Sequence, residues 1–157
     1  MSGSGQQRPR KDGYWKMNSR SPRPLAVATR KADALWQEII CFGGKCLLCG
    51  RTATMVKLCG HHIKGKKARP DLRHVIANGV CVCWGVRGCH DRLHRAGQQY
   101  SEEVLRQFVP EQFALLDELR YAKGSSLVCE MEATCERLRH VLRAMQGEQV
   151  GRDFRND

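Results

Sequence analysis

Cysteine residues gather in the middle of this chain at spacings that suit metal binding. A C-x2-C-G sequence places Cys46 and Cys49 on one tight turn, where both thiolates can point at one ion. Two more thiolates are needed for a tetrahedral zinc site, and Cys83 and Cys89 are the best candidates. Cys81 is an alternative to Cys83, because alternate residues of a strand point to the same face. We therefore predict a structural zinc site in this segment.

The second cysteine pair has an unusually long C-x5-C spacing, so the residues between Cys83 and Cys89 must form a bulge. Gly85 and Gly88 supply the backbone freedom for it. Cys41 and Cys59 are predicted to be ordinary core thiols. Cys129 and Cys135 do not share a helix face with His140, so they are also predicted to be core or surface thiols and not metal ligands.

Four of the six histidines lie in two short pieces of the chain. His90 and His94 are one helical turn apart, so both imidazoles can reach one ion. His61 and His62 are adjacent, and on a strand they would point to opposite sides. One can then bind a metal while the other acts as a general base. The alternative is that these histidines complete zinc sites with the cysteines.

A turn and a strand are predicted between the two histidine pieces. Asn78 and Gly79 form a tight-turn pair, and the alternating residues 80–83 are typical of a strand. The Asn78 amide can brace the loop through backbone hydrogen bonds, although a simple turn residue would look the same.

Basic residues dominate the first two thirds of the chain. The net charge is +11, and residues 1–100 hold 19 basic and 5 acidic side chains. This excess predicts contact with a polyanion, most simply the phosphate backbone of a nucleic acid, unless it is only a solvated basic surface. The cations closest to the histidines are Lys64, Lys66, Lys67, Arg69, Arg73, Arg87, Arg92 and Arg95.

The surrounding elements are predicted to be mostly helical. Apolar spacing favours a helix from about Lys31 to Cys41, stopped by glycines. Further helices are expected to begin at Ser101, Pro110 and Ser126 and to end before Val109, at Gly124 and at Gly147. We expect an α+β fold in four parts: a basic, disordered arm (1–30), a Cys/His domain (31–100), a helical extension (101–147) and a polar tail (148–157).

Several classes of protein are excluded at this stage. No run of about 18 apolar residues exists, so a transmembrane helix is not expected. The first residues lack the apolar region of a secretory signal. With nine cysteines and no export signal, we expect metal rather than disulfides and a cytoplasmic location.

Taken together, the motifs resemble one known family. The string C-x2-C-G, H-H-I, P-D-L-R, N-G-V-x-V-C, C-H-D-x-x-H over residues 46–95 is similar to HNH endonucleases with an embedded zinc knuckle, including small phage and prophage proteins. The resemblance implies a ββα-metal fold, in which a hairpin and a helix hold one catalytic divalent ion. The C-x5-C spacing departs from the C-x2-C that is common in the family.

The resemblance also implies roles for individual residues. His61 and His90 would bind the catalytic ion, with His94 as a further ligand, His62 would be the general base and Asn78 would orient the hairpin. Cys46, Cys49, Cys83 and Cys89 would form the zinc knuckle.

The implied activity is metal-dependent hydrolysis of DNA with Mg²⁺, Mn²⁺, Ni²⁺ or Zn²⁺, in the cytoplasm of a bacterial host and with a phage or host protein as a possible partner. The competing hypothesis from the same residues is a zinc-binding nucleic-acid adaptor without catalysis. The adaptor gives no reason for the two histidine pieces to meet.

Overall fold

The computed structural model describes residues 23–119 and 128–153, and it combines helices with one small antiparallel sheet, which confirms the α+β class. The elements in chain order are α1 (Pro24–Ile40), β1 (Leu58–His62), the short 3-10 helices η1 (Pro70–Leu72) and η2 (Ile76–Asn78), β2 (Gly79–Cys83), α2 (Cys89–Ala96), α3 (Gln98–Phe108), α4 (Pro110–Glu118) and α5 (Val128–Asp153).

The sheet is a hairpin whose register sends alternate residues to opposite faces. His61 pairs with Val80, and His62 pairs with Gly79 at the end of the ladder. The face that carries His61 and Val80 is buried against α2, α3 and α4. The opposite face lies against α1, where Gly60 leaves room for a large side chain. The hairpin therefore delivers adjacent histidines to different surroundings.

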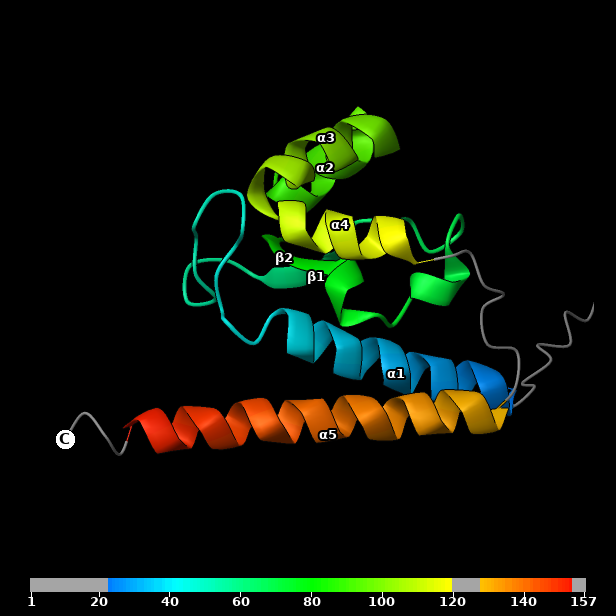
Figure 1. Ribbon diagram of the computed structural model, residues 1–157. Helices are drawn as coiled ribbons and strands as arrows, with labels where there is room; N and C mark the ends of the chain where they lie inside the picture. Colours follow the sequence, from blue (N-terminus) through cyan, green and yellow to red (C-terminus); the bar gives the residue numbers. More distant parts are fainter. Residues whose placement is uncertain (1–22, 120–127, 154–157) are drawn as a thin grey trace, which may run out of the picture.

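The hairpin lies between two groups of helices (Figure 1). On one side α2, α3 and α4 enclose a core with Val82, Leu93, Leu105 and Phe113. On the other side α1 packs between the hairpin and α5, and α1 and α5 run in the same direction (Figure 1). The long helix α5 thus reaches the hairpin only through α1.

Several helix boundaries differ from the prediction. Helix α1 begins at Pro24 rather than at Lys31, because proline is well suited to the first helical position. Residues 24–30 are thus helical, while residues 1–22 of the predicted arm lie outside the described residues.

The later helices differ for local reasons as well. Helix α3 begins at Gln98, so Ser101 is a buried residue of its first turn and not its cap. Helix α5 continues past Gly147 to Asp153, because one glycine costs a helix only about 1 kcal/mol. Helix α4 already ends at Glu118, and Gly124 and Ser126 lie outside the described residues.

Among the described residues, no helix combines the length and the apolar character that crossing a membrane requires.

We expect Gly79→Ala to disturb the packing of α1 on the hairpin. A Cβ at this position would stand 2.5 Å from both Ile40 and Trp36. Such overpacking should lower the free energy of unfolding by about 1–3 kcal/mol, measured by urea denaturation. Gly43→Ala is the matched control, because a Cβ there has no atom within 4 Å, and it should change the value by less than about 0.5 kcal/mol. Equal stability of the two variants would contradict this packing.

Candidate metal centres

Four cysteine thiols converge at one end of the hairpin. The sulfur atoms of Cys46, Cys49, Cys83 and Cys89 all lie within 4.8 Å of one another. The Sγ atoms of Cys49 and Cys83 are 3.8 Å apart, about the edge of a tetrahedron with Zn–S bonds of about 2.3 Å. The donor set and its spacing therefore fit a zinc-type site.

Positive groups surround the four sulfur atoms. Arg51 donates from Nε to Cys49 at 3.4 Å and from a terminal nitrogen to Cys83 at 3.6 Å, and Arg92 donates to Cys89 at 3.2 Å. Arg51 lowers the pKa of Cys49 to about 6, whereas burial raises the pKa of Cys89 to about 12. Two guanidinium groups thus offset the negative charge of a four-thiolate site, and the raised pKa of Cys89 means that this thiol ionises more readily with a cation beside it.

Local backbone geometry places each cysteine pair. At the first pair, Gly50 has a φ of +73° and its N–H donates to the Cys46 carbonyl. At the second pair, the predicted bulge is present, with Gly85 at a φ of +117°. A Cβ on Gly88 would stand 2.8 Å from the Cys83 carbonyl oxygen, so only glycine fits there.

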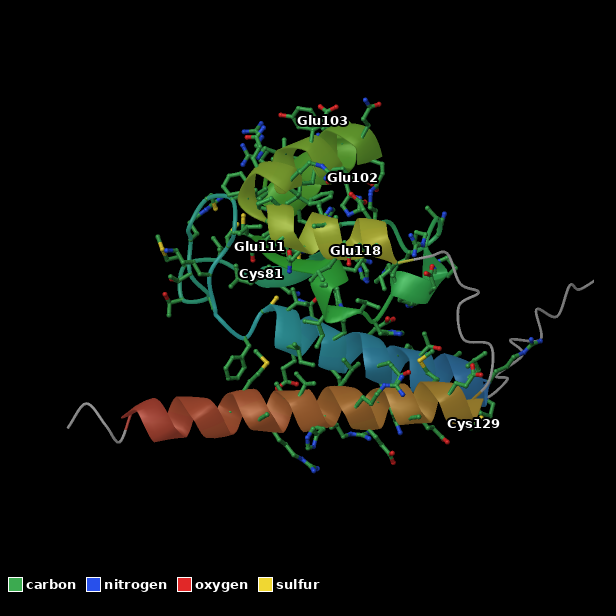
Figure 2. All side chains as sticks on the ribbon, viewed as in Figure 1. Cys81, Glu102, Glu103, Glu111, Glu118 and Cys129 are labelled. Atoms are coloured by element: carbon green, nitrogen blue, oxygen red, sulfur yellow. The ribbon has the colours of Figure 1, made fainter. Side chains whose placement is uncertain are left out.

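The structure resolves the alternative between Cys81 and Cys83 in favour of Cys83. Cys81 lies on the α1 side of the hairpin, next to Cys41 (Figure 2). Cys59 and Cys135 are buried but do not belong to the four-sulfur cluster. Cys129 lies exposed in the first turn of α5 (Figure 2). Within the described part of the chain, the thiols outside this cluster form no second group of three metal ligands.

Three of the predicted histidines form a second cluster. His61 on β1 meets His90 and His94 on α2, and one ring nitrogen of each lies within 4.8 Å of the others. The Nε2 atoms of His90 and His94 are 3.3 Å apart. His61 is 6% exposed, and its Nε2 lies 3.3 Å from the Ser101 hydroxyl.

The second ring nitrogen of His61 is an orphaned buried atom. Nδ1 has no hydrogen-bond partner among the described residues. When Nε2–H donates to Ser101, Nδ1 carries a lone pair that is free to bind a cation. Burial, followed by the nearby His94 and His90, lowers the pKa of His61 to about 3, and burial also lowers the pKa of His90. Neutral imidazoles are what a metal requires, so this group fits a divalent ion.

His62 faces the same cavity from the other side of the strand. Its ring stacks on Trp36 of α1 with centroids 4.0 Å apart, and its Nε2–H donates to the Arg73 carbonyl at 2.8 Å. A carbonyl only accepts hydrogen bonds, so Nδ1 of His62 carries the lone pair. Burial lowers the pKa of His62 to about 4, so the ring is neutral at pH 7. A cavity of about 430 Å³ is lined by His62 together with the three clustered histidines.

The loop that accepts the His62 hydrogen bond is anchored to α1. Asp33 accepts hydrogen bonds from Arg73 at 2.9 and 2.6 Å and from His74 at 2.9 Å. Burial alone would raise the pKa of the Asp33 carboxyl, but the bonds from His74 and Arg73 hold it well below its usual range. Helix α1 therefore fixes both the ring of His62 and the carbonyl that orients it.

Asn78 braces the hairpin loop, as the sequence predicted. It is fully buried, its Oδ1 accepts from the Lys64 N–H at 2.7 Å, and its Nδ2 donates to the carbonyls of Lys64 and Leu72. Asn78 makes these bonds to the backbone and does not line the histidine cavity.

Most of the predicted phosphate-binding cations have partners within the chain. Lys64 pairs with Glu102, Arg69 with Asp71, Arg73 with Asp33 and Arg95 with Asp91, while Arg92 donates to the Cys89 sulfur. Among the described residues, four exposed cations of the predicted set have no ion pair: Arg92, which is held by the Cys89 sulfur, and Lys66, Lys67 and Arg87.

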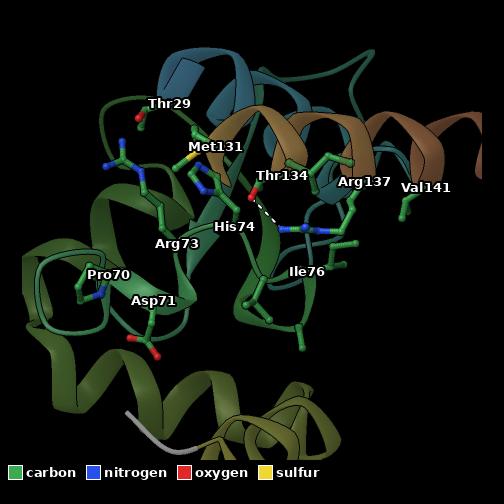
Figure 3. Close-up of a pocket in the computed structure, with 13 residues that line it drawn as sticks. Thr29, Pro70, Asp71, Arg73, His74, Ile76, Met131, Thr134, Arg137 and Val141 are labelled. Carbon is green, nitrogen blue, oxygen red and sulfur yellow. Dashed lines mark hydrogen bonds between the residues drawn. The ribbon is translucent and has the colours of Figure 1, made fainter. Parts of the chain in front are cut away.

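A larger cavity of about 810 Å³ lies between α5 and the loop at residues 70–77 (Figure 3). Its walls are mostly apolar, with Met131 and Ile76 among them. Arg137 donates to Thr134 at 2.9 Å, shown by the dashed line, and Arg73 is held by Asp33. The clustered histidines do not line this larger cavity; they line the smaller one.

Sequence reasoning missed four residues that shape the histidine cavity. Ser101 contacts His61, Trp36 stacks on His62, and Asp33 anchors Arg73. Trp84 lies with its ring 4.7 Å from His90. In each contact the two residues belong to different elements or loops, so no local spacing indicated it.

Comparison with family models, with curated proteins and with solved structures finds no match to this chain. Functional inference therefore rests on the geometry of the two clusters.

Cys83→Ser should abolish tight zinc binding, whereas Cys81→Ser should not. The two residues lie on one strand, but only the Cys83 sulfur belongs to the four-thiol cluster. Zinc content by mass spectrometry should be about one ion per chain in the wild type and in Cys81→Ser. Full zinc retention by Cys83→Ser, or its loss from Cys81→Ser, would contradict the assignment.

Asp33→Asn should destabilise the protein at neutral pH, and this destabilisation should shrink as the pH falls below the unfolded pKa of the carboxyl. A carboxyl whose pKa is depressed by folding stabilises the native state above its unfolded pKa of about 3.9 and loses that effect as the pH falls. Because the Asp33 side chain is 34% exposed, we expect only about 1 kcal/mol at pH 7. Urea unfolding of both proteins at pH 7 and near pH 3 measures this, and a difference that grows toward pH 3 would refute it.

Proposed function

We propose that this chain is a metal-dependent endonuclease of the HNH type that hydrolyses DNA phosphodiester bonds. In this proposal, β1, β2 and α2 form the ββα-metal core, and the four cysteines hold a structural zinc ion. The observation that carries the proposal is the shared cavity of His62 with His61, His90 and His94. A zinc-binding adaptor would have no need for three converging imidazoles beside a separately oriented fourth.

His62 is the general base in this mechanism. Its Nε2–H is held by the Arg73 carbonyl, so Nδ1 accepts the proton of the attacking water. Trp36 stacks on the ring and keeps it in this orientation. The water oxygen bonds to phosphorus, the bond from phosphorus to the 3′ oxygen breaks, and the leaving oxygen takes a proton from solvent.

His61, His90 and His94 would hold the divalent ion. When bound, such an ion supplies positive charge that stabilises the phosphate and the leaving oxygen. Ser101 orients His61 by contacting Nε2, which leaves Nδ1 for the ion. An all-imidazole set favours transition metals in affinity, and Mg²⁺, Mn²⁺, Ni²⁺ and Zn²⁺ are all candidates.

The DNA backbone would be positioned by the exposed cations. Lys66 lines the histidine cavity. Lys67 and Arg87 are exposed, and they lie close in the sequence to His62 and His90, respectively. Their charges attract phosphates without selecting a sequence.

His62→Ala should reduce metal-dependent cleavage of supercoiled plasmid by about 10²- to 10⁴-fold, the usual contribution of a general base. The assay compares Mg²⁺, Mn²⁺ and EDTA, and His62→Gln, which keeps an N–H donor for the Arg73 carbonyl, checks that loss of that hydrogen bond is not the cause. The matched control is His140→Ala, an exposed residue of α5 that belongs to neither cluster and should cleave normally.

Unchanged cleavage by both His62 variants would refute the proposed mechanism. No cleavage by wild type with any of these ions, together with zinc binding and DNA retardation on a gel, would favour the non-catalytic adaptor.

A further inference from the structure

The loop between Cys83 and Cys89 carries an exposed aromatic ring at the mouth of the histidine cavity. Trp84 is 51% exposed, in contrast to Trp36, which is 3% exposed on the inner wall of the same cavity. The ring of Trp84 lies 4.7 Å from the ring of His90 at an angle of 46°. Tryptophan is the largest apolar side chain, so half-exposure beside a polar cluster indicates a contact surface.

The exposure of Trp84 does not come from a loose loop. Cys83 and Cys89 join both ends of the loop to the four-thiol cluster. The Trp84 N–H donates to the Lys57 carbonyl at 2.8 Å, and the Gly88 N–H donates to the Gly85 carbonyl at 2.8 Å. The loop therefore presents the indole in a fixed position, which lowers the entropic cost of binding a flat partner.

The loop also contains a residue in an uncommon backbone conformation. Arg87 has a φ of +64°, and its N–H donates to the Asp91 carboxylate at 3.2 Å. That bond ties the loop to the first turn of α2 and leaves the Arg87 side chain exposed.

Three exposed cations lie near Trp84 in the chain or in the fold. The Lys57 carbonyl accepts the Trp84 N–H, Arg87 belongs to the same loop, and Lys66 lines the same cavity. No ion pair is formed by these three side chains among residues 23–119 and 128–153. An aromatic ring among unpaired cations is the combination that binds single-stranded nucleic acid, because the cations contact phosphates while the ring stacks on a base.

We propose that Trp84 stacks on an unpaired base next to the phosphate that enters the histidine cavity, so that the preferred substrate is DNA with a single-stranded or distorted segment at that point. In an intact duplex every base is already stacked, and a ring at the mouth of the cavity has no free base face to contact. This proposal rests on the proposed function for the identity of the cavity, but the binding step needs no cleavage.

The test is fluorescence anisotropy with a labelled 20-nucleotide single strand and with its fully paired duplex. The full-length, zinc-loaded chain carries His62→Ala throughout, so that the probes stay intact. Trp84→Ala should weaken binding of the single strand by about 5- to 100-fold, which corresponds to about 1–3 kcal/mol per stacked base, and change duplex binding by less than twofold.

Two further variants distinguish stacking from a structural effect. Trp84→Phe keeps an aromatic face and should retain most of the single-strand affinity. Val86→Ala alters the most exposed apolar residue of the same loop, at 86% exposure, and should bind both probes like the parent protein. Zinc content and circular dichroism confirm that each variant is folded.

Equal loss of affinity for both probes in Trp84→Ala, or no loss for either, would overturn the stacking proposal. The proposed nuclease function can fail separately. If wild type cleaves no DNA but Trp84→Ala still weakens only single-strand binding, the stacking proposal stands and the catalytic one falls.

Discussion

The convergence of four thiols at one end of a two-stranded hairpin is the constraint on which the rest of this structure depends. A two-stranded hairpin is marginal by itself, and here its strands are separated by the long loop of residues 63–78. Cys83 ends β2 and Cys89 begins α2, while Cys46 and Cys49 come from the turn that follows α1. A cation at these sulfur atoms would therefore fix where α2 begins relative to the strand, and with it the position of His90 opposite His61.

The alternation of side chains along β1 gives two adjacent histidines different surroundings. His61 points to α2 and α3, where it meets two other imidazoles and the Ser101 hydroxyl. His62 points to α1, where Trp36 and the Arg73 carbonyl hold it. Glycine at positions 60 and 79 of the α1 face allows the Trp36 ring to approach the hairpin. In the proposed mechanism, this opposite orientation of two adjacent residues lets one strand supply both a metal ligand and a general base.

Local spacing in the sequence predicted the parts of the site that depend on neighbouring residues. The C-x2-C-G turn, the helical pair His90 and His94, the bulge after Cys83 and the bracing by Asn78 all depend on short stretches of chain, and the structure has each of them. The choice between Cys81 and Cys83 needed the register of the hairpin, which no single stretch contains. The sequence predicts Ser101 to be a helix cap. Its contact with His61 joins residues 40 positions apart, so local spacing does not reveal it.

The ion pairs of the charged residues could not be predicted from short stretches of sequence either. Eight cations near the histidines suggested one phosphate-binding surface, yet Lys64, Arg69 and Arg73 pair with carboxylates of the chain itself. Composition gives the sign and size of a charge excess, but ion pairing depends on tertiary structure. Of these eight, Lys66 lines the histidine cavity and Arg87 lies in the loop that carries Trp84, and neither forms an ion pair with a described residue.

In the proposed function, the two clusters hold two different ions, a tightly bound structural one and an exchangeable one that serves catalysis. The most direct measurement is the metal content of the zinc-loaded protein after equilibrium dialysis against Mn²⁺, for wild type and His61→Ala. We expect one zinc and one manganese per wild-type chain, and one zinc with no manganese in His61→Ala. Wild type without manganese, or His61→Ala with a full equivalent of it, would rule out a second, exchangeable ion at the histidine cluster.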